Sequence, residues 1–298
     1  MPPGAAPTEG GLPPLEDVES VRAGIRERLA KVRATFAVMS GKGGVGKSAV
    51  AVNLALALAQ RGARVGLLDA DLNGPSVAKM LGLRGQPVRV GASGLLPAPG
   101  PLELRVQSMD FFLQGTEPLA FDGATGEHAP LRSVMEEMAL ADLLGGTLWG
   151  ELEFLVIDLA PGADRLPSFC RLYSELAGAL AVTIPTEVSL LAVERSIRRA
   201  HEARIPMLGL IENMGTAVCG ACGRESSLFR EAPVERMARE LDVPVLARIP
   251  FDPALAAAAD AGRPFVNHPG RPSQAARTFA ELATRVAELL APPVEASA

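Results

Sequence analysis

The chain has 298 residues, which is enough for one large domain or two small ones. Its formal net charge of −5 excludes a global positive field of the kind that attracts nucleic acid. Apolar residues make up 48 % of the chain and aromatic residues only 4 %. This composition predicts a core of Ala, Leu and Val, as helices packed on a parallel sheet require.

The cysteine content and the N-terminal sequence indicate a cytoplasmic protein. Three cysteines are too few for a secreted disulfide framework in a chain of this length. The first residues lack the basic region and apolar run of a signal peptide. The longest apolar stretches are shorter than the about 20 residues of a membrane span. We therefore expect no membrane and no nucleic acid among the partners.

The predicted elements begin with an N-terminal helix over residues 15–33, which follows a disordered tail over 1–14. Beyond it, short apolar runs alternate with helical segments, and this alternation predicts an α/β fold, a mainly parallel sheet flanked by helices on both faces. The predicted strands are 36–39, 65–68, 104–106, 154–157, 180–184, 207–211 and 245–249. The predicted helices are 48–60, 76–81, 131–144, 189–203, 234–241, 253–260 and 273–290.

The segment 84–130 fits this alternation least well. It is rich in Gly and Pro and has few periodic signals, which predicts a loop-rich insertion with a small hairpin. The whole domain is expected to span residues 34–290, and a second disordered tail to cover 291–298.

Residues 41–48 satisfy the phosphate-loop motif G-x-x-x-x-G-K-S/T between a predicted strand and a predicted helix. Glycines let backbone N–H groups turn toward phosphates, and the helix N-terminus adds its positive end. Lys47 is expected to meet the β- and γ-phosphates, and the Ser48 hydroxyl to coordinate Mg²⁺. The sequence therefore predicts a P-loop NTPase that binds a nucleoside triphosphate with Mg²⁺. The residues expected around the phosphates are Gly41, Lys42, Gly43, Gly44, Val45, Gly46, Lys47, Ser48 and Ala49.

Carboxylates follow two of the predicted strands. Asp69 and Asp71 end the strand 65–68, and residues two apart on a strand share a face. Both can therefore point at the crevice where α/β proteins bind ligands, and one of them would help to hold Mg²⁺ through water. Asp158 ends the apolar run 154–157, which is the Walker B pattern of a Mg²⁺ ligand. The N–H of Gly162, just beyond, is expected to sense the γ-phosphate.

Lys42 gives the phosphate loop a second lysine, and the loop resembles the deviant Walker A loop of the MinD, ParA and nitrogenase iron protein class. The resemblance implies a homodimer in which Lys42 reaches the nucleotide of the partner. It also implies that Asp71 orients the attacking water and joins Lys42 and Lys47 as a catalytic group. Asn213 would read the adenine edge, and Pro250 and Asp252 would belong to the loop that packs on the base.

Cys219 and Cys222 form a C-x-x-C pair in a predicted loop after Asn213. A redox pair would need a thioredoxin-like strand–helix junction, which is absent here. A metal site needs about four ligands, and two protomers would supply four thiolates. A bridging 4Fe-4S cluster and structural zinc both fit that set. Cys170 lies in a helical stretch and is expected to be a small buried thiol.

Four segments together resemble the Mrp/ApbC family of iron–sulfur cluster carrier ATPases over residues 34–290. They are 40–48, 67–76, 149–158, and 211–214 with Cys219 and Cys222. The resemblance implies a slow ATPase whose homodimer carries a 4Fe-4S cluster, bound near 215–229, from an assembly scaffold to apo iron–sulfur proteins.

The second switch departs from the family pattern Asp-x-Pro-Pro-Gly-Thr-Gly-Asp. The Thr hydroxyl, the second Gly and the final Asp are replaced, and Arg165 stands where the family has the Asp. The segment reads Asp158, Leu159, Ala160, Pro161, Gly162, Ala163, Asp164 and Arg165. Two alternatives remain open at this point. One is a MinD- or ParA-like spatial organiser, and the other is an ATP-responsive regulator with structural zinc.

Overall fold

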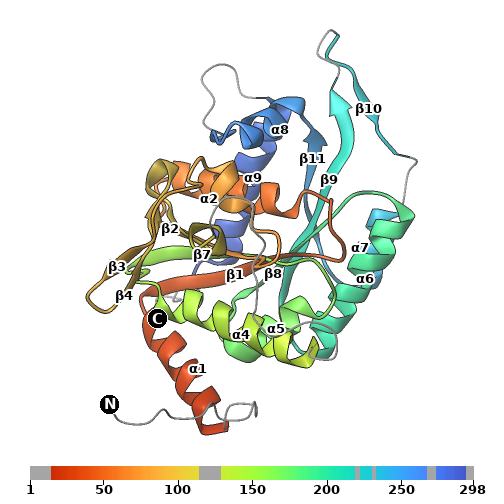
Figure 1. The fold of residues 1–298 in the computed structure, drawn as a ribbon. Coiled ribbons are helices and arrows are strands. Elements are labelled where there is room, and N and C mark those ends of the chain that lie inside the picture. Colours follow the sequence, from red (N-terminus) through yellow and green to blue (C-terminus); the bar gives the residue numbers. More distant parts are fainter. Residues whose placement is uncertain (1–14, 114–128, 219–221, 230–232, 267–272, 293–298) are drawn as a thin grey trace, which may run out of the picture.

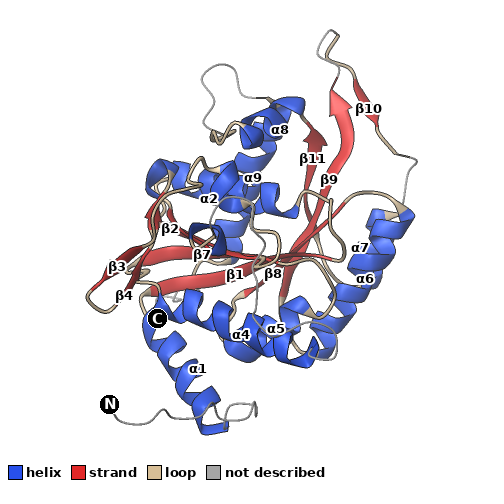
Figure 2. Cartoon of the chain, in the orientation of Figure 1, coloured by secondary structure: helices blue, strands red, loops and turns tan. Residues whose placement is uncertain are grey.

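The computed structural model describes residues 15–113, 129–218, 222–229, 233–266 and 273–292. A central sheet runs through the molecule, and helices cover both of its faces (Figures 1 and 2). The predicted tail over 1–14, most of the tail over 291–298, and Cys219 lie outside the described residues.

The strands are β1 (Val32–Ser40), β2 (Val65–Ala70), β3 (Arg89–Gly91), β4 (Gly94–Leu96), β5 (Ala98–Pro99), β6 (Arg105–Ser108), β7 (Leu152–Leu159), β8 (Gly178–Thr183), β9 (Met207–Val218), β10 (Glu225–Ser227) and β11 (Val245–Phe251). The helices are α1 (Leu15–Leu29), α2 (Lys47–Gln60), α3 (Val77–Met80), α4 (Ala129–Gly146), α5 (Arg165–Leu172), α6 (Glu187–Glu202), α7 (Val234–Glu240), α8 (Pro253–Asp260) and α9 (Gln274–Leu289), with short 3-10 turns η1 (Pro101–Glu103) and η2 (Met109–Phe111).

The main sheet has the strand order β10-β9-β8-β1-β7-β2-β6-β5, and β11 also pairs with β9. Most pairs are parallel, and the antiparallel exceptions are the pairs of β10 with β9 and of β5 with β6. This confirms the predicted fold class. Strand β7 lies between β1 and β2, so that Asp158 is aligned with Val38 on one side and with Asp69 on the other.

The sheet separates two apolar layers because neighbouring residues of a strand point to opposite faces. On β1, Phe36 and Val38 belong to the layer under α2 and α9, whereas Ala37 and Met39 belong to the layer under α4, α5 and α6. Helix α2 is buried along most of its length, because it packs on β1, β2 and β7 and also against α9, which itself packs on β11. That burial explains its nearly continuous run of Ala, Leu and Val.

The structure differs from the predicted elements at the junction between the first helix and the first strand. The predicted helix over 15–33 ends at Leu29, and β1 already begins at Val32. Val32 pairs with Leu152 of β7, so the residue that completed the helical pattern belongs to the sheet. The predicted hairpin of the insertion is present as β3 and β4. None of the helices in the described part of the chain combines the length and the hydropathy that a membrane span needs.

Trp149 anchors the C-terminal end of α4 on the sheet. Its side chain is fully buried, and its indole Nε1 donates a hydrogen bond to the carbonyl oxygen of Leu144 at 2.9 Å. Its ring lies against Gly66 of β2, where a Cβ atom would be 3.1 Å from the indole. Trp149 therefore fixes where α4 lies relative to the strand that leads to Asp69.

We expect Trp149→Ala to lower the free energy of unfolding by about 3–5 kcal/mol, because it leaves a cavity and an unpaired carbonyl. Chemical denaturation followed by circular dichroism measures this change. Val90→Ala, at a side chain that is 75 % exposed, is the control and should change stability by less than about 0.5 kcal/mol. Equal stability of the two variants would contradict this role of Trp149.

Candidate nucleotide site

The phosphate loop connects β1 to α2, and its glycines fit the backbone path. Gly44 and Gly46 both have a φ of +81°, a conformation that residues with a side chain rarely adopt. Gly41 meets a different constraint, since a methyl group there would overlap the backbone of Ala192 on α6. The loop is therefore shaped by its own left-handed residues and by the close approach of α6.

Lys47 and Asp158 form a buried ion pair at the base of this loop. Lys47 Nζ lies 2.5 Å from Asp158 Oδ1, and the two side chains are 6 % and 0 % exposed. Lys47 Nζ also donates a hydrogen bond to Ser48 Oγ at 3.1 Å. Burial raises the pKa of Asp158, and the ammonium group of Lys47 opposes that shift. Three residues that the sequence assigned to phosphate and Mg²⁺ binding thus meet at one point.

The second oxygen of Asp158 bears on the metal prediction. Oδ2 is buried, and no donor in the described part of the chain contacts it. A buried carboxylate oxygen without a partner is costly, so native structures usually satisfy it with a donor, a water or an ion. Together with the Ser48 hydroxyl it offers the hard oxygen ligands that Mg²⁺ prefers. The residues present therefore fit the predicted ion.

Asp69 is fully buried and is held by the loop that follows β2. Its Oδ2 accepts hydrogen bonds from the backbone N–H of Ser76 at 3.0 Å and of Val77 at 3.1 Å, and from Ser108 Oγ at 3.2 Å. Burial raises the pKa of Asp69 to about 7, the charge of Asp158 adds to the rise, and the N–H donors oppose it. Asp69 thus organises the loop, and its contact to Mg²⁺ through water stays a prediction.

Asp71 lies at the start of the same loop. It is half-buried, and its Oδ1 accepts a hydrogen bond from the N–H of Gly74 at 3.2 Å. Its own N–H donates to Asp69 Oδ1 at 3.2 Å. The carboxylate is therefore fixed at the carboxyl edge of the sheet, next to the strand that carries Asp158, and its role in orienting water stays a prediction.

The loop after β7 is tied directly to the end of β1. The N–H of Gly162 donates a hydrogen bond to the carbonyl oxygen of Ser40 at 2.9 Å. To sense a γ-phosphate, as predicted, this N–H would have to leave Ser40. Two ion pairs that the sequence did not suggest hold the rest of the loop, from Asp164 to Arg199 at 3.1 Å and from Arg165 to Glu136 at 3.2 Å.

Asn213 reaches the phosphate loop from β9. Its Nδ2 donates a hydrogen bond to the carbonyl oxygen of Val45 at 2.9 Å, and a side chain at Gly46 would overlap that amide. The predicted contact of Asn213 to adenine is untested, but a second role is now visible, which is to hold the loop. On β11, Pro250 is buried, and Asp252 caps α8 by accepting a hydrogen bond from the N–H of Ala254 at 2.9 Å.

The cysteines lie at different distances from this site. Cys222 is exposed and lies between β9 and β10, in the hairpin that projects from the body of the protein (Figure 1). Cys170 is half-buried in α5, where burial raises the pKa of its thiol to about 11.

Lys42 is half-buried, and its carbonyl oxygen accepts a hydrogen bond from Ser40 Oγ at 3.0 Å. Within the described ranges, no three His, Cys, Asp or Glu side chains cluster as a metal site.

We expect Asn213→Ala to weaken nucleotide binding by about 5-fold, because it removes one hydrogen bond worth roughly 1 kcal/mol from the loop. Isothermal titration calorimetry with ADP and with GDP separates the two roles of Asn213. Loss of a loop contact weakens both nucleotides equally, whereas loss of an adenine contact weakens ADP alone. Thr216→Val on the same strand is the control and should bind like the wild type.

The comparisons with known proteins agree with this geometry. The family model of the NUBPL iron-transfer P-loop NTPases, of the ParA group, matches residues 31–287. The iron–sulfur cluster carrier protein of Saccharolobus solfataricus is 38 % identical over 278 residues, which cover 92 % of this chain and 90 % of that protein. The carrier protein of Aquifex aeolicus is 37 % identical over 268 residues, covering 89 % of this chain and 70 % of the relative.

Two solved structures show the same arrangement of elements. A nucleotide-binding protein from Archaeoglobus fulgidus, in complex with ADP, has a TM-score of 0.69 and 34 % identity, and the match covers 81 % of this chain and 91 % of that one. The cell division ATPase MinD of Pyrococcus furiosus has a TM-score of 0.63 and 26 % identity, covering 86 % and 99 %. The predicted resemblance to the iron–sulfur cluster carriers is confirmed, and the chain belongs to the NUBPL iron-transfer family of P-loop NTPases.

Proposed function

We propose that the protein is an ATPase whose homodimer carries a 4Fe-4S cluster and transfers it to apo iron–sulfur proteins. The main support for this proposal is that strand β9 runs from the nucleotide site to the cysteine hairpin. This strand brings Asn213 to the phosphate loop and continues to Val218, which pairs with Glu225 in the hairpin of Cys222. A change at the nucleotide can therefore reach the cysteine hairpin along one strand.

ATP is the nucleotide of this proposal, and Lys47, Ser48 and Asp158 are the residues that hold its phosphates and Mg²⁺. The ion, when bound, neutralises phosphate charge and polarises the γ-phosphoryl group. Lys47 Nζ pairs with Asp158 and donates to Ser48, so its ammonium group would exchange these contacts for phosphate oxygens when the nucleotide binds. Asp71 would orient the attacking water, and Lys42 of each protomer would reach the nucleotide of the other.

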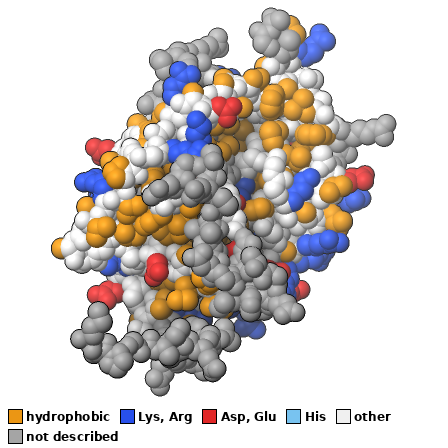
Figure 3. Space-filling view, in the orientation of Figure 1, with side chains coloured by type: hydrophobic (Ala, Val, Ile, Leu, Met, Phe, Trp, Pro, Cys, Tyr) orange, Lys and Arg blue, Asp and Glu red, His pale blue; other side chains and the backbone are white. Residues whose placement is uncertain are grey.

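The homodimer provides the thiolates that one chain lacks. Cys219 and Cys222 supply two, and a 4Fe-4S cluster takes about four. Apolar side chains on the hairpin and on the neighbouring strand β11 support an interface there, and Figure 3 shows apolar side chains gathered over this part of the molecule. These side chains, 36–45 % exposed, are Val218, Leu228, Phe229 and Phe251.

The cluster is cargo in this proposal, received from an assembly scaffold in the cytoplasm and passed on to apo-proteins. Two relatives are named iron–sulfur cluster carrier proteins, which supports an iron–sulfur cluster as the cargo. The MinD- or ParA-like alternative explains the fold but leaves the C-x-x-C pair without a role. Structural zinc in the same thiolates is the competing outcome of the test below.

We expect Cys222→Ala to abolish cluster binding, because it removes two of the four thiolates of a dimer. Anaerobic reconstitution with iron and sulfide, followed by absorbance and metal analysis, should give about four irons per wild-type dimer. Cys170→Ala, at a half-buried thiol in α5, is the matched control and should load normally. Stoichiometric zinc in place of iron would overturn the carrier proposal.

We expect Lys42→Ala to impair dimerisation induced by a non-hydrolysable ATP analogue, while binding of that analogue to the monomer stays within about 5-fold of wild type. Sedimentation velocity with and without the analogue measures the first effect, and calorimetry the second. Lys31→Ala, at an exposed lysine on the α1–β1 connection, is the control. Normal analogue-dependent dimers of the Lys42 variant would refute the shared site.

A further inference from the structure

Glu136 on α4 connects the two loops that flank the nucleotide site. Its Oε1 accepts a hydrogen bond from Asn73 Nδ2 at 3.1 Å, in the loop after β2. Its Oε2 accepts one from Arg165 Nη1 at 3.2 Å, at the end of the loop after β7. The Glu136 side chain is only 13 % exposed, although that of Arg165 is 47 % exposed. Each carboxylate oxygen thus holds a different loop, and we refer to Asn73, Glu136 and Arg165 as the loop bridge.

Both loops border the residues that would act on the phosphates. The loop after β2 carries Asp71, two residues before Asn73. The loop after β7 starts just beyond Asp158 and is tied to the end of β1 through the hydrogen bond from Gly162 to Ser40. The distance between the two loops therefore sets where Asp71 stands relative to Asp158 and the phosphate loop.

The sheet itself does not hold the loops together. Strands β2 and β7 remain paired as far as Ala70 and Leu159. Beyond these residues the two segments line a cavity of about 180 Å³, together with α4 and α5. Asn73, Glu136 and Arg165 all lie on the lining of this cavity. The loop bridge thus spans a gap that apolar packing does not fill.

Helix α4 gives Glu136 a fixed support. The carbonyl oxygens near the end of the helix accept hydrogen bonds from Thr147 Oγ1, at Leu143, and from Trp149 Nε1, at Leu144. Leu143 and Leu144 are themselves buried in the apolar layer between the sheet and α4, α5 and α6. A carboxylate on this helix is therefore held in position more firmly than one on either loop.

We propose that Glu136 is a positioning residue for ATP hydrolysis, which holds the Asp71 loop and the Arg165 loop at the spacing that turnover requires. The proposal rests on the ATPase activity of the proposed function. In the pattern of the family that the chain resembles, an acidic residue stands at the position of Arg165, whereas here Arg165 provides a basic partner for Glu136. The altered second switch is thereby anchored through an ion pair to α4.

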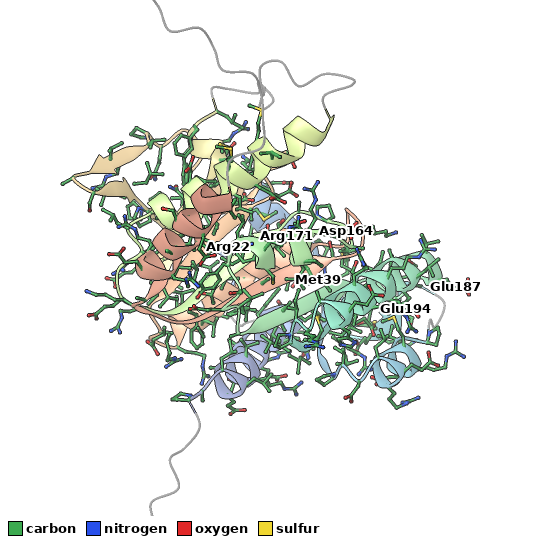
Figure 4. The ribbon with its side chains drawn as sticks, turned by 90° about the horizontal axis from the view of Figure 1, so that it is seen from below. Arg22, Met39, Asp164, Arg171, Glu187 and Glu194 are labelled. Atoms are coloured by element: carbon green, nitrogen blue, oxygen red, sulfur yellow. The ribbon has the colours of Figure 1, made fainter. Side chains whose placement is uncertain are left out.

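The next residue of α4 offers a matched control. Glu137 pairs with Arg171 of α5 at 2.7 Å, and the carbonyl oxygen of Arg171 accepts a hydrogen bond from Arg22 Nε at 2.7 Å. Figure 4 shows Arg171 and Arg22 near each other on the lower side of the molecule. This pair joins α4 to α5 and lines the same cavity, but no hydrogen bond within the described residues links its side chains to Asn73 or Arg165. Glu137→Ala therefore removes an ion pair from the same helix without touching the loop bridge.

The first experiment measures steady-state ATP hydrolysis. We expect Glu136→Ala to lower kcat about 10-fold with KM nearly unchanged, because small misplacements of reacting groups are costly. Glu136→Gln, which keeps an acceptor for Asn73, should lose less. Glu136→Ala combined with Arg165→Ala should be no slower than Glu136→Ala alone, because both changes break the same link. Glu137→Ala should turn over like the wild type, and equal kcat of the two alanine variants would overturn the proposal.

The second experiment needs no turnover. Amide hydrogen exchange without nucleotide should rise in residues 71–76 when Arg165 is changed to Ala, and in 160–165 when Asn73 is changed to Ala. Glu137→Ala should alter neither segment. If neither substitution raises exchange in the other loop, the loop bridge does not couple the two loops, even if the enzyme is active. A wild-type protein without ATPase activity would instead overturn the proposed function, while the exchange data would still show whether the loop bridge couples the two loops.

Discussion

The ammonium group of Lys47 and the carboxylate of Asp158 lie 2.5 Å apart in a site where neither is more than 6 % exposed. Two charges can be buried only if they are paired with good geometry, because each loses its water. The pair joins the first residue of α2 to the end of β7. The ion pair therefore forms only when the strand order, the conformation of the phosphate loop and the position of α2 on the sheet are all native.

Backbone approach is the second constraint on the site. Gly41 lies against the backbone of α6, and Gly46 lies against the amide of Asn213, so the phosphate loop is fixed from two sides by elements far from it in sequence. A larger residue at either glycine would move the loop away from its supports. The same strand that holds the loop also leads to the hairpin of Cys222. The nucleotide and the cysteines thus share one rigid element.

Polar contacts hold the open edge of the sheet together. At this edge the strand pairing ends, and hydrogen bonds run from Gly162 to Ser40 and from the loop after β2 to Asp69. The carboxylate of Glu136 extends this pattern to the two loops at once. Such contacts are directional and can be exchanged for contacts to a ligand, which suits a site that must respond to a phosphate.

The sequence by itself determined the fold class and the phosphate loop with Lys47 and Ser48 in it, because these depend on local periodicity and on the spacing of a few residues. It also indicated Asp158 as a strand-end carboxylate. Only the tertiary structure decided that Asn213 holds Val45, 168 residues away, and that Glu136 joins Asn73 to Arg165. These contacts follow from the strand order β9-β8-β1-β7-β2, which brings β9 near the phosphate loop and sets the loops after β2 and β7 side by side. No local pattern encodes that order, since it is set by how distant apolar faces pack on one another.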